Sequence, residues 1–208
     1  GYVGNDNHGL AGVEKTMESR LGGNSPEGGQ PLKLSLDVRL QHIVRDEIKK
    51  AMEDFKAIGA TGIVVDAKSG EVLALSSLPD FDPHNPARAS DAQKFNRATL
   101  GAYEMGSIFK TFTLAMGLDA GRITMNDGFD ATNPLKISTF TIHDAHGKKR
   151  WLSVPEIYAY SSNIGTARIA LKNGTKMQRS FLDKLGMTSP LQLELPERAV
   201  PLFPADWK

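Results

Sequence analysis

Apolar residues recur every three or four positions between residues 40 and 55, which places them on one stripe of a helix. Asp37 precedes the stripe and is a candidate N-cap, because its carboxylate can accept hydrogen bonds from the first free N–H groups. Gly59 follows it as a stop signal. The sequence therefore predicts a helix between these two residues. Its apolar residues are Leu40, Ile43, Val44, Ile48, Ala51, Met52 and Phe55.

Alternation of apolar and polar residues predicts strands elsewhere in the chain. Residues 32–36 alternate over one short stretch. Residues 62–66 and 71–77 flank the turn sequence Lys68-Ser-Gly70, an arrangement typical of a β-hairpin.

The remaining patterns are helical. Ser153-Val-Pro-Glu156 has the spacing of a capping box, with proline in the first turn. We expect its helix to reach about Tyr160, to break at residues 161–163 and to resume through Leu171. Further helices are predicted over residues 13–21, 106–120 and 177–185, and residues 22–30 have the glycine-rich composition of a linker.

The composition narrows the classes of function. The chain has 208 residues, 40% of them hydrophobic, enough for one core and a small extra piece. A formal net charge of +1 gives no argument for a nucleic acid partner. The chain has no cysteine, which excludes disulfides and cysteine-ligated zinc, and no apolar run approaches the roughly 18 residues of a membrane span.

Candidate chemistry begins with Ser107 and Lys110, the only Ser-x-x-Lys in the chain. Residues three apart share a helix face, so the lysine amine can reach the serine hydroxyl. This geometry can activate a nucleophile without histidine. A lone Ser-x-x-Lys is a weak motif, since an N-cap serine followed by a solvated lysine has the same spacing.

A second motif strengthens the first. Ser161-Ser-Asn163 is the only Ser-x-Asn, and it begins 54 residues after Ser107 (161 minus 107). On its own it could be an ordinary break between helices, because serine and asparagine favour caps and turns. Ser-x-x-Lys combined with a serine–asparagine motif is typical of penicillin-binding proteins and serine β-lactamases.

The flanking sequence closely resembles the transpeptidase domain of class B penicillin-binding proteins. The resemblance rests on residues 62–75, 79–85, 96–98 and 161–165, together with Gly9-Leu-Ala-Gly-Val-Glu14, which resembles the end of that family's N-terminal module and favours its septal, cell-division branch. It implies an α+β fold of the β-lactamase/DD-peptidase type, an antiparallel sheet flanked by helices with a well-represented helical subdomain. Residues 1–30 would be the remnant of the N-terminal pedestal module and a linker, and residues 31–208 the N-terminal part of the transpeptidase domain.

The resemblance also implies roles for the motif residues. Ser107 would attack the D-Ala-D-Ala end of a peptidoglycan stem peptide, and Lys110 would take its proton. Ser161 would relay a proton to the leaving group, and Asn163 would hold the Lys110 amine and the substrate amide, so Ser107 and Asn163 also bind substrate. A β-lactam would acylate Ser107 and inhibit. No cofactor or metal is expected, because His143-Asp-Ala-His146 lacks a third nearby ligand and favours a turn.

The family's third motif, Lys-Thr/Ser-Gly, is not present in these 208 residues. We therefore expect a truncated, incomplete transpeptidase domain that is inactive by itself, with the last three strands of the sheet beyond Lys208 and an open edge on the 62–77 hairpin. In the parent protein we expect a membrane anchor, a periplasm-facing position at the bacterial inner membrane, and membrane proteins of the division machinery as partners.

Two other classes of function stay open. A serine β-lactamase or DD-carboxypeptidase shares the first two motifs, although the Gly-Val-Glu segment argues against it. A non-catalytic division scaffold or β-lactam sensor is favoured for the chain alone by the absence of the third motif.

Overall fold

The computed structural model describes residues 1–22, 29 and 31–203. The chain forms two compact units, each described here by itself. Unit 1 consists of residues 1–102 and 190–200, and unit 2 of residues 103–189 and 201–203. The predicted module boundary near residue 30 falls beside residues outside the described ranges, and it stays a prediction.

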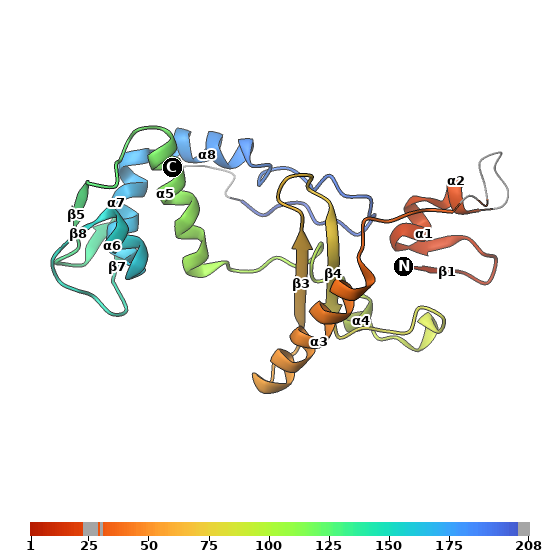
Figure 1. Ribbon diagram of the computed structural model, residues 1–208. Coiled ribbons are helices and arrows are strands. Elements are labelled where there is room, and N and C mark those ends of the chain that lie inside the picture. The colour runs from red at the N-terminus through yellow and green to blue at the C-terminus, as the bar shows by residue number, and fades with distance from the viewer. Residues whose placement is uncertain (23–28, 30, 204–208) are drawn as a thin grey trace. The chain divides into compact units, whose positions relative to one another are not determined.

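A helix packed on a hairpin forms the centre of unit 1. α3 (Val38–Asp54) lies beside the antiparallel strands β3 (Ala60–Val65) and β4 (Val72–Leu78) (Figure 1). The Gln41 side chain joins the two layers, since it donates to the Leu75 carbonyl at 2.7 Å and accepts from the Leu75 N–H at 2.9 Å. The antiparallel pairing of β3 with β4 confirms the predicted hairpin. Asp37 is confirmed as the N-cap of α3, because its carboxylate accepts from the N–H groups of Arg39 and Leu40.

Two predictions for this region were wrong in detail. Residues 32–36 form no strand. Among the described residues, the backbone hydrogen bond between this part of the chain and β4 is that of Asp37 N–H to the Leu73 carbonyl, at 2.9 Å, and one such bond does not make a strand pair. The helix ends at Asp54 rather than near Gly59, since Lys56 adopts a left-handed φ of 51°. Phe55 consequently leaves the apolar stripe and is 83% exposed.

Short elements complete unit 1. Residues 13–21, predicted as one helix, form two helices that meet at Met17. The elements are β1 (Tyr2–Val3), β2 (Gly9–Ala11), α1 (Gly12–Thr16), α2 (Glu18–Leu21), η1 (Pro86–Arg88) and α4 (Asp91–Lys94).

Unit 2 is mainly helical and carries both motifs. It begins with a 3₁₀ turn, η2 (Gly106–Phe109), which leads into α5 (Lys110–Asp119). Later helices are α6 (Val154–Ala159), α7 (Asn163–Asn173) and α8 (Thr175–Lys184). The predicted break between two helices is confirmed, although it covers residues 160–162, because Asn163 is already the first residue of α7. The capping box is confirmed too, because Glu156 N–H donates to Ser153 Oγ and Ser153 N–H donates to Glu156 Oε2.

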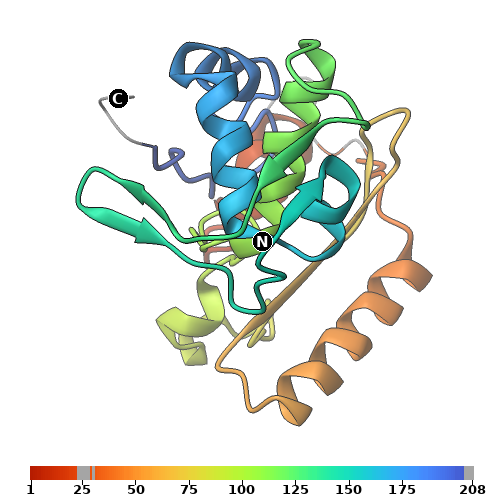
Figure 2. The same cartoon turned by 90° about the vertical axis from the view of Figure 1, so that its left-hand side faces the viewer.

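Two small antiparallel pairs lie between α5 and α6 in the sequence. β5 (Gly128–Asp130) pairs with β8 (Trp151–Ser153), and β6 (Leu135–Ile137) pairs with β7 (Phe140–Ile142). The β6–β7 hairpin extends away from the helices of its unit (Figure 2). The sequence patterns missed all four strands, because three residues are too few to show a period.

The core of unit 2 joins its helices to the β5–β8 pair. Apolar side chains from α5, α6, α7 and β8 make one buried cluster, and burial of such side chains supplies the main stabilisation of a fold. The two helices that flank the second motif are thus anchored in the same core as the helix that follows the first. The cluster comprises Leu114, Ile123, Ala131, Leu152, Val154, Ile157, Ile164 and Ile169.

Candidate active site

Ser107 lies at the entrance to the α5 helix. Gly106 precedes it with a φ of 55°, a conformation that favours glycine, and the chain turns there into the 3₁₀ helix η2. The Ser107 side chain is exposed. The backbone N–H of Ser107 lies in the first turn of this helical segment, where N–H groups have no carbonyl partner within the helix. Ser107 is therefore accessible to a substrate and offers a backbone donor beside its hydroxyl.

Lys110 connects the two motifs. Its Nζ donates to the Ser161 carbonyl oxygen at 2.6 Å and to Ser161 Oγ at 2.8 Å. Within the described residues no hydrogen bond joins it to Ser107, which was the contact expected from the i, i+3 spacing. Partial burial lowers the pKa of the Lys110 amine from its ordinary value, while the negative charge of Asp144 acts in the opposite direction.

Ser161 has an unusual backbone. It stands between the end of α6 and the start of α7 with a φ of 53°, the left-handed region that non-glycine residues seldom occupy. Its N–H donates to the Tyr158 carbonyl at 3.1 Å. This turn leaves both the carbonyl and the hydroxyl of Ser161 directed at one amine.

Ser162 is buried and makes hydrogen bonds that hold the loop in place. It is 2% exposed, and its Oγ accepts from Gly165 N–H at 3.0 Å as the N-cap of α7. The same hydroxyl donates to Asp144 Oδ2 at 2.8 Å, and Ile164 N–H donates to Asp144 Oδ1 at 2.9 Å. Asp144 was missed as a functional candidate. The one signal for it was its place in the segment 143–146, interpreted from the sequence as a turn.

Asn163 faces the same segment. Its Nδ2 donates to the His143 carbonyl at 2.8 Å. The expected hydrogen bond from Asn163 to the Lys110 amine is not found among the described residues, nor does any of their groups donate to Asn163 Oδ1. That oxygen remains available for a donor from outside the chain.

Other contacts frame the motifs. Thr111 Oγ1 and Tyr158 OH are 3.0 Å apart and join α5 to α6. Lys148 Nζ lies 4.6 Å from the ring centroid of Tyr160, the residue before Ser161. Across the described ranges, no group of three or more histidine, aspartate or glutamate side chains could hold a metal ion, and no helix is long and apolar enough to cross a membrane.

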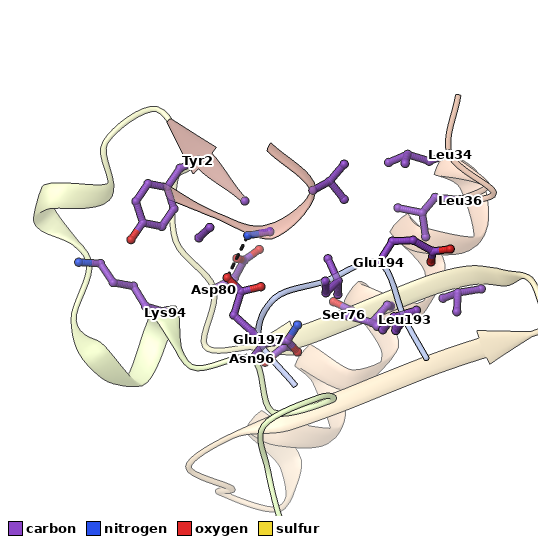
Figure 3. A pocket seen from close by; sticks show the side chains of 18 of the residues that line it. Tyr2, Leu34, Leu36, Ser76, Asp80, Lys94, Asn96, Leu193, Glu194 and Glu197 are labelled. Atoms are coloured by element: carbon purple, nitrogen blue, oxygen red, sulfur yellow. Dashed lines mark hydrogen bonds between the residues drawn. The ribbon is translucent and has the colours of Figure 1, made fainter. Parts of the chain in front are cut away.

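A separate cavity of about 400 Å³ lies in unit 1. Its lining comes from both chain segments of the unit and includes Tyr2, Leu34, Ser76 and Glu194 (Figure 3). Gly12 N–H donates to Glu197 Oε1 at 2.9 Å in the lining. None of Ser107, Lys110, Ser161 and Asn163 lines this cavity. We therefore place the candidate active site at these four residues of unit 2 and not at the cavity.

Comparison with known proteins gives consistent matches. The family model described as "Penicillin binding protein transpeptidase domain" matches residues 60–207. A probable peptidoglycan D,D-transpeptidase FtsI of Caulobacter vibrioides is 42% identical over 207 residues, 100% of this chain and 35% of the relative. A probable peptidoglycan D,D-transpeptidase PenA of Neisseria meningitidis is 35% identical over 86% of this chain and 32% of the relative.

A solved structure agrees with these matches. The crystal structure of penicillin-binding protein 3 from Mycobacterium tuberculosis superposes with a TM-score of 0.89 and 27% identity, over 98% of this chain and 48% of that one. The chain spans about a third of the length of the curated relatives it matches, 35% and 32% of the two.

Proposed function

We propose, on the premise that this chain belongs to the penicillin-binding protein transpeptidase domain family, that the intact protein is a serine-type peptidoglycan D,D-transpeptidase of cell division. The observation that carries the proposal is the Lys110 amine bound to both oxygens of Ser161, next to an exposed Ser107 one helical turn earlier. The names of the Caulobacter and Neisseria relatives support the same reaction.

The family and the fold were both predicted correctly. The match over residues 60–207 confirms the resemblance to penicillin-binding proteins, and the relatives fit the septal branch. The superposition on penicillin-binding protein 3 confirms the β-lactamase/DD-peptidase-like fold.

In the proposed reaction, Ser107 Oγ attacks the penultimate carbonyl of a stem peptide that ends in D-Ala-D-Ala. The peptide C–N bond breaks, an ester forms on Ser107, and the last D-alanine leaves as an amine. An amino group of a neighbouring stem peptide then attacks the ester. An amide cross-link forms and the Ser107 hydroxyl is restored.

Proton transfer in this scheme uses Lys110 and Ser161. A neutral Lys110 amine takes the Ser107 proton, and burial favours the neutral form because it lowers the pKa of Lys110. Ser161 Oγ, 2.8 Å from that amine, passes a proton to the leaving nitrogen. The N–H of Ser107 serves as one oxyanion donor, and Asn163 Oδ1 accepts from the substrate amide.

The same residues would also explain inhibition by β-lactams. A β-lactam presents a carbonyl similar to that of D-Ala-D-Ala, and its ring opens on Ser107 to leave an ester that hydrolyses slowly. Because the proposed substrate belongs to the cell wall, we propose that the reaction takes place on the periplasmic side of the inner membrane. There the intact protein would be anchored and would contact other membrane proteins of the division machinery.

The third motif of the family limits what the 208 residues do alone. In the family, Lys-Thr/Ser-Gly supplies a second cation, and its strand supplies a second oxyanion donor. Loss of one such donor typically costs about 10²–10³ in rate. We therefore propose that this chain by itself is inactive or acylates at least that much more slowly than the intact protein.

Covalent labelling with a fluorescent penicillin, read by intact mass, tests the proposal on the intact protein. One adduct is expected on the wild type and none on Ser107→Ala. Ser180→Ala is the matched control, because Ser180 is an exposed serine on α8. An adduct on Ser107→Ala would refute the assignment of the nucleophile, and rapid release of the opened penicillin would favour a β-lactamase.

A further inference from the structure

The segment 143–150 runs against the second motif. The His143 carbonyl, the Asp144 carboxylate and the Lys148 amine each contact a residue between Tyr160 and Ile164. We infer that Asp144 is a positioning residue, which holds the Ser161–Asn163 loop so that Ser161 presents both of its oxygens to Lys110. The inference rests on the proposed function for its kinetic consequence alone.

The Asp144 carboxylate holds the loop through two hydrogen bonds. One carboxylate oxygen accepts from Ser162 Oγ at 2.8 Å and the other from Ile164 N–H at 2.9 Å. Ser162 and Ile164 are 2% and 4% exposed, so neither donor has ready access to water as an alternative. Hydrogen bonds to an ionised carboxylate are stronger than neutral ones, and the start of α7 favours a negative charge.

The two hydrogen bonds to Asp144 also constrain the backbone of Ser161. A left-handed φ on serine costs free energy and persists only where the surroundings impose it. Ser161 is followed by Ser162, whose hydroxyl donates to Asp144. The N–H of Ser161 donates to the Tyr158 carbonyl. Asp144 thereby fixes the peptide that carries the Ser161 carbonyl, the closest partner of Lys110.

Asp144 also acts on Lys110 through its charge. Its negative charge keeps the pKa of that amine from falling as far as burial would take it. Removal of the charge should therefore lower the pKa of Lys110. Removal of a charge that lies away from both motifs would leave this pKa where it is.

Asp127 provides a matched control in the same unit. It too accepts from a backbone N–H and a hydroxyl, both of Thr124, at 3.1 and 3.2 Å. It contacts neither motif, and its ion pair with Lys172 spans 3.6 Å.

The test compares Asp144→Asn, Asp144→Glu and Asp127→Asn. The titration of the Lys110 amine is followed by lysine NMR on the 208-residue chain. The pH dependence of β-lactam acylation is measured on the intact protein. Asp144→Asn should titrate Lys110 at lower pH than the wild type, acylate about tenfold or more slowly, and show its rate midpoint shifted to lower pH.

The other variants separate charge from geometry. Asp144→Glu keeps the charge, so the Lys110 titration should stay near that of the wild type while acylation slows. Asp127→Asn should match the wild type in both measurements. Asp144→Asn behaving like Asp127→Asn in both would overturn the inference. If the wild type forms no adduct, the proposed function fails, and an unchanged Lys110 titration in Asp144→Asn would then still overturn the inference.

Discussion

Lys110 Nζ lies 2.6 Å from the carbonyl oxygen and 2.8 Å from the hydroxyl oxygen of Ser161, a residue 51 positions further along the chain. The contact joins the first residue of α5 to the turn between α6 and α7. The contact fixes the position of the amine, and partial burial lowers its pKa; a general base for Ser107 needs both properties. The following predictions test this relationship and the packing that supports it.

Lys110→Arg should abolish most of the acylation. A guanidinium stays protonated at any pH at which the protein is folded, so it cannot take the Ser107 proton. We expect the second-order rate constant for β-lactam acylation of the intact protein to fall by about 10²–10⁴. Lys172→Arg, at an exposed ion pair of the same unit, is the control. Equal rates in the two variants would rule out Lys110 as the base.

Ser161→Ala and Ser161→Gly should separate chemistry from backbone conformation. Both lose the hydroxyl that binds Lys110, so both should acylate about 10²-fold more slowly. Glycine accepts the φ of 53° that alanine resists. The glycine variant should therefore be more stable than the alanine variant by about 1 kcal/mol in urea unfolding. Wild-type acylation by either variant would contradict the relay role of Ser161.

Glu156 should make the stability of unit 2 sensitive to acid. The ion pair with Arg150, with Nη2 to Oε1 at 2.7 Å, and the N–H of Ser153 lower the pKa of Glu156 from 4.5 to about 2. A depressed pKa in the folded state contributes stability above the unfolded value of about 4.5, and this contribution disappears as the pH falls toward 2.

Thermal unfolding of the wild type and Glu156→Gln from pH 6 to pH 2 checks this effect. The difference in Tm should be largest at pH 6 and should shrink on acidification. Glu53→Gln, at a 4.0 Å ion pair on the surface of α3, is the comparison. A Tm difference for Glu156→Gln that stays constant to pH 2 would contradict the prediction.

Gly165→Ala should destabilise the contact between α6 and α7. An added Cβ would lie 2.6 Å from Cγ1 and 2.8 Å from Cδ1 of Ile157, whose side chain is fully buried. Overpacking of this kind typically costs about 1–3 kcal/mol. Alanine gains about 1 kcal/mol of helix propensity over glycine, which only partly offsets that cost.

The measurement is urea unfolding of the single variant and of Gly165→Ala combined with Ile157→Val. The second change removes a methyl group from the crowded side and should recover part of the loss. No loss in the single variant would mean that the two helices can separate at this contact.

Local sequence was enough for several elements. The carboxylate of Asp37 and the pair Ser153 and Glu156 cap their helices as expected, because each cap is made within three residues of chain. The β3–β4 hairpin and the break between α6 and α7 followed from patterns of the same short range. Two motifs and their flanking residues were sufficient to identify the family.

Tertiary structure decided the contacts between distant residues. Spacing paired Lys110 with Ser107, whereas the fold turns the amine toward Ser161. No pattern linked Asp144 to the second motif, because its two donors are Ser162 Oγ and Ile164 N–H, which lie 18 and 20 positions away along the chain. Caps, turns and periodicity depend on neighbours in the sequence and can be predicted from it. The direction of a side chain in a site depends on the helices packed around it, and those are brought together only when the core of Leu114, Ile157 and Ile164 forms.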